Sequence, residues 1–305
     1  MEKRIYQKGL IYIKGSSKVY AKLALFLAAL IWGSSFIVMK DAVDLTAPHL
    51  LLALRFSIAC ILLSVIFIKN LKKINLTYIL HGGIIGLMLF LAYSTQTIGI
   101  TDTTPGKNAF LTAIYCVMVP FIFWFFTKKK PDKYNLIAAF LCITGIGFIS
   151  LNSDFSIGFG DTLTLVGGLF FALHLVAISI FGADKDPIVI TILQFFFAAV
   201  FCWITTLLFE SAIPQISTEA LPGVIYLAVF CTAGALLLQN IGQKYTNPSP
   251  AAIILTLESV FGAIFSVSLG YEILTLKLFF GFLLIFLSVI ISETKLSFLK
   301  RKKNM

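Results

Sequence analysis

One acidic residue, Glu258, stands in the middle of a long apolar stretch near the end of the sequence. It is about ten residues into the run 249–269, so in a membrane-spanning helix it lies close to the middle of the bilayer. A carboxylate there costs roughly 2.5 kcal/mol or more on insertion scales. Glu258 is therefore a candidate for binding a cationic group or a coupled proton. The alternative is a structural role, through an ion pair with Arg55 or hydrogen bonds across helices.

Two further ionisable side chains lie inside apolar runs. Arg55 is about two helical turns into the run 48–68, and its long side chain can reach outward to the polar interface. We favour a structural role for it, with binding of a substrate carboxylate as the alternative. His174 lies in the run 161–181, where an imidazole can donate, accept or titrate near neutral pH. The alternative for His174 is a packed, hydrogen-bonded residue.

A third group of candidates carries hydroxyl, amide, phenol or indole groups within the apolar runs. Together with Glu258 and His174, these side chains are predicted to line a substrate-binding cavity: Trp32, Ser35, Tyr93, Gln96, Asn108, Tyr115 and Gln239. They cluster on the first, third, fourth and eighth runs, and Glu258 and His174 add the ninth and sixth. The alternative is that each side chain only bonds across helices, for about 0.6–2 kcal/mol.

The sequence lacks the motifs that mark common catalytic centres. It contains no GxSxG, no HExxH and no phosphate-binding GxxxxGK[ST]. Its five cysteines all lie inside apolar runs, without the spacing of metal ligands. We therefore expect no enzymatic activity, no cofactor, no metal site and no direct use of ATP.

Membrane helices are the elements that must position these residues. The chain has 305 residues, of which 59% are hydrophobic and 12% are charged, against about 25% charged in soluble domains. The net charge of +10 does not indicate nucleic-acid binding, because the basic residues sit in short clusters between apolar runs. Composition therefore predicts an all-α integral membrane protein, with the lipid bilayer as its surroundings.

Ten apolar runs are each near the length needed to cross about 30 Å of hydrocarbon. They cover residues 21–39, 48–68, 77–97, 104–126, 134–151, 161–181, 187–209, 221–242, 249–269 and 276–292. Within the fourth run, Pro120 is expected to kink the helix. In the third run, Gly82 and Gly86 have the spacing that allows close helix packing.

The distribution of basic residues predicts the orientation of the chain. With the N-terminus inside, 20 of the 24 Lys and Arg residues fall in the two tails, the first turn of the first run and alternate connectors. The other connectors carry mainly Asp and Glu. The positive-inside rule then predicts a multi-pass protein of the plasma membrane with both termini cytoplasmic.

The second half of the sequence weakly repeats the first. Residues 96–123 align without a gap on residues 239–266 at an offset of 143, and around the first and sixth runs the offset is 139. The polar pairs that result are Gln96 with Gln239, Tyr115 with Glu258, Ser35 with His174, and Arg55 with Gln194. Repetition of this kind predicts that each half is one structural unit.

Five spans in each half is an odd number, so the second half must enter the membrane from the opposite side. We therefore predict two inverted five-helix repeats, with a substrate site between them and access that alternates by rocking. The predicted division is a basic cytoplasmic tail at 1–20, a first repeat at 21–151, a second repeat at 152–293 and a basic cytoplasmic tail at 294–305.

Several short motifs in this order resemble one known family. They are WGSSF at 32–36, ALRF at 53–56, LExVFxAIF at 257–265, and Glu272 just after the ninth run. With ten spans in two inverted halves, the chain resembles the EamA-type transporters of the drug/metabolite transporter superfamily over about residues 21–292. The resemblance implies a transporter of small metabolites or amino acids, often an exporter, with a central cavity lined by helices 1, 3, 4, 6, 8 and 9.

These observations predict a secondary transporter of small metabolites, amino acids or related polar or amphipathic solutes. It is expected to work by alternating access and in the direction of efflux, with protons or a counter-transported solute as possible partners. The alternatives are an importer or exchanger of the same fold, and a membrane sensor or partner subunit without flux. A membrane enzyme acting on lipid-linked substrates is disfavoured, since the sequence offers it neither paired carboxylates nor a metal cluster.

Overall fold

Helices make up almost all of the computed structural model, which describes residues 2–128, 130–150, 157–210, 217–246 and 248–296. The α-helices are α1 (Glu2–Val43), α2 (Pro48–Ile66), α3 (Leu76–Thr101), α4 (Pro105–Thr112), α5 (Tyr115–Thr127), α6 (Lys133–Ser150), α7 (Phe159–Phe181), α8 (Pro187–Thr205), α9 (Leu221–Tyr226), α10 (Ala235–Lys244), α11 (Pro248–Ser268) and α12 (Leu276–Thr294). Short 3₁₀ or π-helical segments are η1 (Ile68–Lys73), η2 (Thr206–Glu210), η3 (Thr218–Ala220) and η4 (Leu227–Gly234).

Each of the ten predicted runs coincides with one helix or with helices that follow one another directly, so the all-α membrane fold is confirmed. Within the described residues, seven stretches are long and apolar enough to cross a membrane. They are Val19–Val43, Pro48–Ile66, Leu76–Thr101, Pro105–Thr127, Phe159–Phe181, Pro187–Glu210 and Thr218–Lys244. Three shorter apolar helices, Lys133–Ile149, Ile254–Ser268 and Leu276–Ile291, coincide with the other predicted runs.

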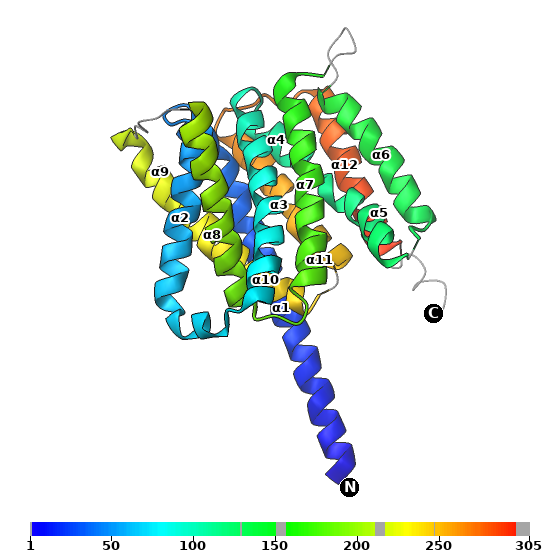
Figure 1. Ribbon diagram of the computed structural model, residues 1–305. Helices are drawn as coiled ribbons and strands as arrows, with labels where there is room; N and C mark the ends of the chain where they lie inside the picture. Colours follow the sequence, from blue (N-terminus) through cyan, green and yellow to red (C-terminus); the bar gives the residue numbers. More distant parts are fainter. Residues whose placement is uncertain (1, 129, 151–156, 211–216, 247, 297–305) are drawn as a thin grey trace.

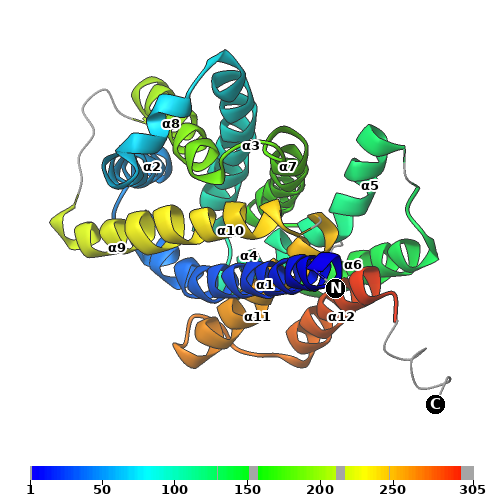
Figure 2. The same cartoon turned by 90° about the horizontal axis from the view of Figure 1, so that it is seen from below.

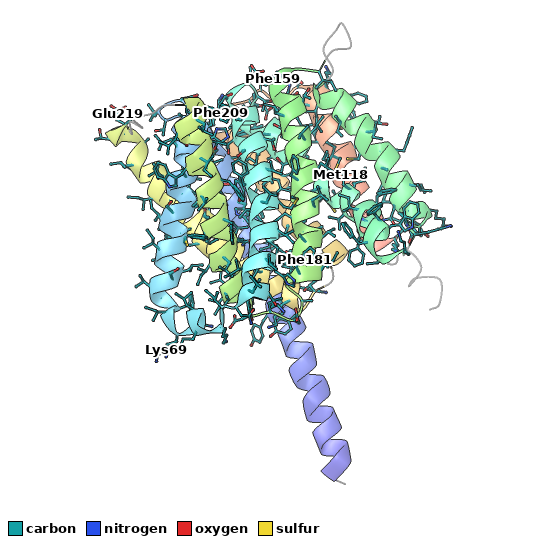
Figure 3. The ribbon with its side chains drawn as sticks, in the orientation of Figure 1. Lys69, Met118, Phe159, Phe181, Phe209 and Glu219 are labelled. Atoms are coloured by element: carbon teal, nitrogen blue, oxygen red, sulfur yellow. The ribbon has the colours of Figure 1, made fainter. Side chains whose placement is uncertain are left out.

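Successive spans run up and down through one bundle (Figure 1). Lys69 and Phe181 mark what we call the lower end, and Phe159, Phe209 and Glu219 mark the upper end (Figure 3). The helix α1 begins in the basic N-terminal region, and its first part projects below the bundle. The predicted C-terminal tail from 297 onward and the predicted boundary at 151–152 lie outside the described residues.

The two halves of the chain interleave in the bundle. Seen from below, α1 and the α9–α10 stretch run alongside each other between α2, α8 and α3 on one side and α11 and α12 on the other (Figure 2). The helix α1 packs on α11, and in the corresponding contact α7 packs on α4 and α5. The pairs α2 with α8 and α6 with α12 join equivalent helices of the two halves. The core therefore lies between the repeats.

Opposite helix directions accompany this pairing. The helix α1 rises from the lower end, whereas its counterpart α7 descends from the upper end (Figure 1). Equivalent side chains near the centre of the bundle can therefore face one another across the boundary between the halves.

The fourth run is broken at a place that the sequence did not indicate. The helix α4 ends at Thr112 and α5 begins at Tyr115, so the break lies at Ala113 and Ile114. Pro120 is inside α5, which continues through it as helix. The kink expected at Pro120 stays a prediction, because a proline removes a backbone donor and crowds the carbonyl four residues back without ending the helix in every case.

Close helix packing at Gly82 and Gly86 is confirmed. A Cβ added to Gly82 would lie 2.5 Å from the Leu193 Cβ, and one added to Gly86 would lie 2.9 Å from the Gln194 carbonyl oxygen. Both neighbours belong to α8. The two glycines therefore let α3 approach α8, which fixes the α3 residues that line the centre of the bundle.

Candidate functional site

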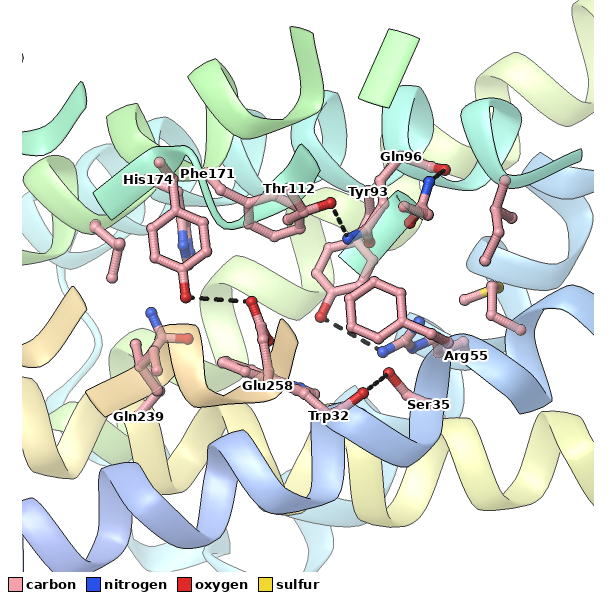
Figure 4. Close-up of a pocket in the computed structure, with 17 residues that line it drawn as sticks. Trp32, Ser35, Arg55, Tyr93, Gln96, Thr112, Phe171, His174, Gln239 and Glu258 are labelled. Carbon is pink, nitrogen blue, oxygen red and sulfur yellow. Dashed lines mark hydrogen bonds between the residues drawn. The ribbon is translucent and has the colours of Figure 1, made fainter. Parts of the chain in front are cut away.

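Helices of both repeats enclose a cavity whose side chains are drawn in Figure 4. It holds about 570 Å³ of space between atoms, including its opening, which is in the range of small-molecule sites. The centre of a water molecule can move through only about 40 Å³ of that space, so the walls lie close together. The lining residues are Trp32, Ser35, Phe36, Met39, Arg55, Tyr93, Gln96, Ile100, Asn108, Thr112, Tyr115, Phe171, His174, Leu175, Gln239, Leu255 and Glu258.

All nine residues predicted to line a binding cavity belong to this one set. They come from α1, α3, α4, α5, α7, α10 and α11. These helices belong to the first, third, fourth, sixth, eighth and ninth spans, which are the spans that the resemblance implies. The second span also contributes, through Arg55 on α2. The sequence therefore identified the polar part of the lining, apart from Thr112, although it favoured a structural role for Arg55.

Glu258 on α11 is buried, with 6% of its surface exposed. The Tyr115 hydroxyl on α5 donates a hydrogen bond to its Oε1 at 3.1 Å, which Figure 4 marks at Glu258. No ion pair between Glu258 and Arg55 occurs among the described residues. Of the two structural roles considered from the sequence, the structure supports a hydrogen bond across helices and not the ion pair.

Arg55 on α2 points into the cavity and is only 1% exposed, so the expected outward reach is wrong. Its Nε donates to the Thr232 hydroxyl, and its Nη2 donates to the Tyr93 hydroxyl at 3.4 Å. The guanidinium carbon lies 4.5 Å from the centre of the Tyr93 ring (Figure 4), within the range of a cation–π contact. These partners hold the side chain inside the bundle.

The π-helical segment η4 supplies one of those partners. Its Thr232 hydroxyl donates to the Leu227 carbonyl oxygen at 2.8 Å, five residues earlier, while accepting from Arg55. The Cys231 carbonyl oxygen in the same segment accepts a bond from the Trp32 Nε1 at 2.8 Å. Such wider turns free backbone carbonyls and often occur at functional sites. Here η4 anchors two cavity residues that belong to other helices.

Hydrogen bonds between helices fix the amide and imidazole groups. The Gln96 Nε2 donates to the Thr112 hydroxyl at 2.9 Å (Figure 4), and the Asn108 Nδ2 donates to the Thr164 hydroxyl at 2.8 Å. The Asn108 Oδ1 has no hydrogen-bond partner among the described residues and is available to a donor.

His174 lies beside a second amide. Its Nε2 is 2.9 Å from the Oε1 of Gln194, and His174 is only 1% exposed. Gln194 is the repeat equivalent of Arg55, and His174 is the equivalent of Ser35. The two halves thus carry different side chains at equivalent positions. The first half has a guanidinium and a hydroxyl where the second half has an amide and an imidazole.

Apolar and aromatic walls make up the part of the cavity that polar residues alone did not reveal. Phe36, Met39, Ile100, Phe171, Leu175 and Leu255 line it along with Trp32. Repeat equivalence was the signal available in the sequence: Phe171, Leu175 and Leu255 are the counterparts of Trp32, Phe36 and Thr112.

The cavity can bind charged and polar groups, and Glu258 can hold a proton. Among the described residues, no group of three His, Cys, Asp or Glu side chains could hold a metal ion.

Comparison with known proteins agrees with this architecture. The chain is 38% identical over 282 residues to a protein described as an uncharacterized transporter of Archaeoglobus fulgidus, covering 91% of this chain and 87% of that protein. It is 25% identical over 299 residues to the uncharacterized transporter YvbV of Bacillus subtilis, covering 93% and 94%. A crystal structure that shares 17% identity has a TM-score of 0.68 and covers 90% of this chain and 98% of its own, a likeness of fold.

The model of the EamA-like transporter family matches the sequence twice, at residues 19–151 and at residues 158–294. The two matches account for most of the chain and for both halves of the bundle. This protein is therefore a membrane transporter and belongs to the EamA-like transporter family, within the drug/metabolite transporter superfamily.

Proposed function

We propose that this transporter carries small polar or amphipathic metabolites, with amino acids as the first candidates, through the central cavity by alternating access. The observation that carries the proposal is the cavity itself, which lies between the repeats and holds a buried guanidinium and a buried carboxyl group. Arg55 and Glu258 are 1% and 6% exposed, and neither has an ion-pair partner among the described residues. Buried charges are normally paired because their desolvation is costly.

A zwitterionic solute supplies both missing partners. Its carboxylate pairs with the Arg55 guanidinium and its ammonium group with the Glu258 carboxylate, while Asn108 offers a further acceptor. The aromatic walls formed by Trp32 and Phe171 suit an apolar side chain of the solute. Substrates with one charge leave one buried group unpaired and bind more weakly.

The orientation in this proposal has both termini in the cytoplasm of a cell whose plasma membrane holds the protein. Lysines of the lower end support it, since Lys69, Lys73, Lys185 and Lys244 lie in or beside connectors at that end. The division into tails at 1–20 and 294–305 and repeats at 21–151 and 152–293 belongs to the same proposal.

Efflux is the direction that we propose, with either a proton gradient or a counter-transported solute as the driving force. A proton gradient would act through Glu258, the one carboxylate of the cavity lining. The two driving forces are separated by the effect of a pH gradient on flux.

The test uses the purified full-length chain in liposomes, with amino acids, their decarboxylated amines and their deaminated acids. Arg55→Gln is expected to lower the apparent affinity for amino acids and for deaminated acids about tenfold or more, because a charged hydrogen bond is worth about 1.5–3 kcal/mol. The affinity for amines is expected to stay the same. Glu258→Gln is expected to lower the apparent affinity for amino acids and amines and to leave the affinity for deaminated acids the same. Absence of flux for every solute in a folded preparation, with and without a pH gradient, contradicts the proposal. Ligand binding without flux would instead indicate a sensor or partner subunit.

A further inference from the structure

A second hollow lies below the central cavity, between the lower parts of α7, α8 and α10. It contains about 1050 Å³ of space between atoms, including its opening, and the centre of a water molecule can move through about 420 Å³ of it. Its lining includes Ser179, Pro187, Asn240, Gln243 and Lys244. We call this hollow the lower vestibule. It is about ten times roomier for water than the central cavity.

The vestibule and the cavity follow one another along the same two helices. On α7 the cavity is lined by His174 and Leu175, and the vestibule by Ile178 and Ser179, one turn further down. On α10 the cavity is lined by Gln239, and the vestibule by Asn240 and Gln243. Along these helices, the residues of the two hollows are therefore separated by no more than about one helical turn.

The side chain of Gln243 lies between the two hollows and bonds to residues of the central cavity. Its Oε1 accepts a bond from the Gln239 Nε2 at 3.0 Å, and its own Nε2 donates to the Leu175 carbonyl oxygen on α7 at 3.5 Å. Gln243 is only 6% exposed although it borders the vestibule. The bond from Gln243 to Leu175 is long, and it links α10 to α7 between the two hollows. At the lower edge of the vestibule, the Lys244 Nζ donates a separate hydrogen bond to the Lys185 carbonyl oxygen at 3.1 Å.

Polar contacts also close the upper end. Asp161 on α7 accepts the Thr103 hydroxyl at 2.5 Å and the Lys107 Nζ at 3.4 Å. The Glu272 carboxylate accepts the Thr104 and Ser266 hydroxyls. These contacts join α4 and the two residues before it to α7 and to the connector before α12.

We infer that Gln243 is the inner gate of this transporter: its side chain separates the lower vestibule from the central cavity and must move for a solute to enter from below. The inference rests on the proposed function, because it takes the central cavity as the transport site.

Thiol labelling tests the gate without any knowledge of the substrate. The five cysteines are replaced in the full chain, and one cysteine is introduced either in the cavity (Ser35→Cys) or in the vestibule (Ser179→Cys). A small charged methanethiosulfonate reagent is added to membranes from the side that carries the termini, identified with a terminal tag. Gln243→Ala is expected to speed labelling of the cavity cysteine about three- to tenfold, the effect of losing one or two ordinary hydrogen bonds. Labelling of the vestibule cysteine is expected to stay the same.

Asn240→Ala is the matched control, because Asn240 lies on the same helix but bonds to Thr191 on α8 at 2.6 Å rather than to α7. It is expected to leave labelling in the cavity unchanged. Gln243→Glu serves if the alanine variant does not fold, since it keeps the side-chain length but loses the donor to Leu175, and it is expected to speed labelling too.

An unchanged cavity rate in a folded Gln243 variant, or an equal increase in Asn240→Ala, overturns the inference. Because this readout needs no flux, failure of the gate and failure of the proposed transport activity are seen separately.

Discussion

Tyr115 and Glu258 are joined by a hydrogen bond of 3.1 Å, and they occupy the same position in the two halves of the chain. Two equivalent residues can touch only where the axis relating the halves passes between them. Five further pairs of equivalents also line the cavity: Trp32 with Phe171, Ser35 with His174, Phe36 with Leu175, Gln96 with Gln239, and Thr112 with Leu255. The cavity is therefore built around that axis, where inverted-repeat transporters bind their substrates.

The Tyr115–Glu258 pair gives the first prediction. Glu258→Gln keeps the acceptor for the Tyr115 hydroxyl but removes the titratable carboxylate, so any pH dependence of transport between pH 5.5 and 8 should disappear with much of the activity. Tyr115→Phe removes only the hydrogen bond and leaves the carboxylate in place, so transport should remain pH-dependent while apparent affinity falls by about two- to tenfold. Uptake into liposomes across that pH range measures both. Unchanged kinetics in Glu258→Gln would assign Glu258 a structural role.

The polar lining was predictable from the sequence because polar groups are rare in membrane spans and recur at related positions in two repeats. Gln96, Tyr115 and Glu258 stood out for this reason alone. The surroundings of Arg55 were not predictable. Its hydroxyl partner Thr232 depends on a π-helical turn, and an apolar run does not reveal how its backbone hydrogen bonds are shifted.

The break in the fourth run was not predicted either. The helix is interrupted at Ala113 and Ile114, between Thr112 and Tyr115 of the cavity. Alanine and isoleucine are ordinary helix residues, so their types give no sign of a break. Contacts at the upper end, such as Thr104 with Glu272, join residues far apart in the sequence and were invisible for that reason.

The second prediction is that opening of the upper end depends on pH through Glu272. Burial raises the pKa of Glu272 above its ordinary value of 4.5, although bonds from Thr104 and Ser266 and the charge of Lys107 oppose the rise, and the charge of Asp161 adds to it. A carboxyl whose pKa is raised by closure takes up a proton on closing. Closure is therefore favoured at low pH and weakens as pH rises from about 4.5 through the raised value.

Labelling of Ser35→Cys from the upper side should accordingly speed up as pH rises from 5 to 8, after correction for the reagent's own pH dependence. Glu272→Gln should flatten this profile, while Glu219→Gln, an exposed carboxylate at the same end, should not. Gly106→Ala gives an independent test. Its Cβ would lie 2.0 Å from the Glu272 Oε2, so it must displace the carboxylate and speed labelling at every pH. A flat profile in the unmodified chain would contradict the prediction.

Glu210 should stabilise the upper end of α2. Its Oε1 accepts the His49 amide at 2.7 Å and its Oε2 accepts the Leu50 amide at 2.9 Å, at the first turn of the helix. A carboxylate there satisfies free backbone donors and complements the helix dipole. Glu210→Gln is expected to cost about 0.5–2 kcal/mol of stability, read as a lower Tm in detergent. Glu219→Gln at the same end should leave Tm unchanged, and an equal loss in both variants would argue against a specific cap.

Asp186 should make the lower end sensitive to acid. It precedes α8, where burial acts to raise the pKa of its carboxyl, but bonds from Lys73, the Ile188 amide and Asn70 outweigh burial and lower it. The Lys73 Nζ lies 2.5 Å from its Oδ2, and the pKa of Lys73 is raised in return. A carboxyl with a lowered folded-state pKa adds stability above its ordinary pKa and loses it as pH falls through the lowered value.

Asp186→Asn is therefore expected to lower Tm at pH 7, and this deficit is expected to shrink as pH falls below the ordinary pKa of an aspartate towards the lowered value of the native carboxyl. Thermal unfolding between pH 3 and 8 measures this difference. Asp184→Asn is the matched control, since that carboxylate is exposed and pairs with its neighbour Lys185. A deficit in Asp186→Asn that persists unchanged down to pH 3 would mean that the amide disturbs packing at the start of α8, and that the charge of Asp186 contributes nothing.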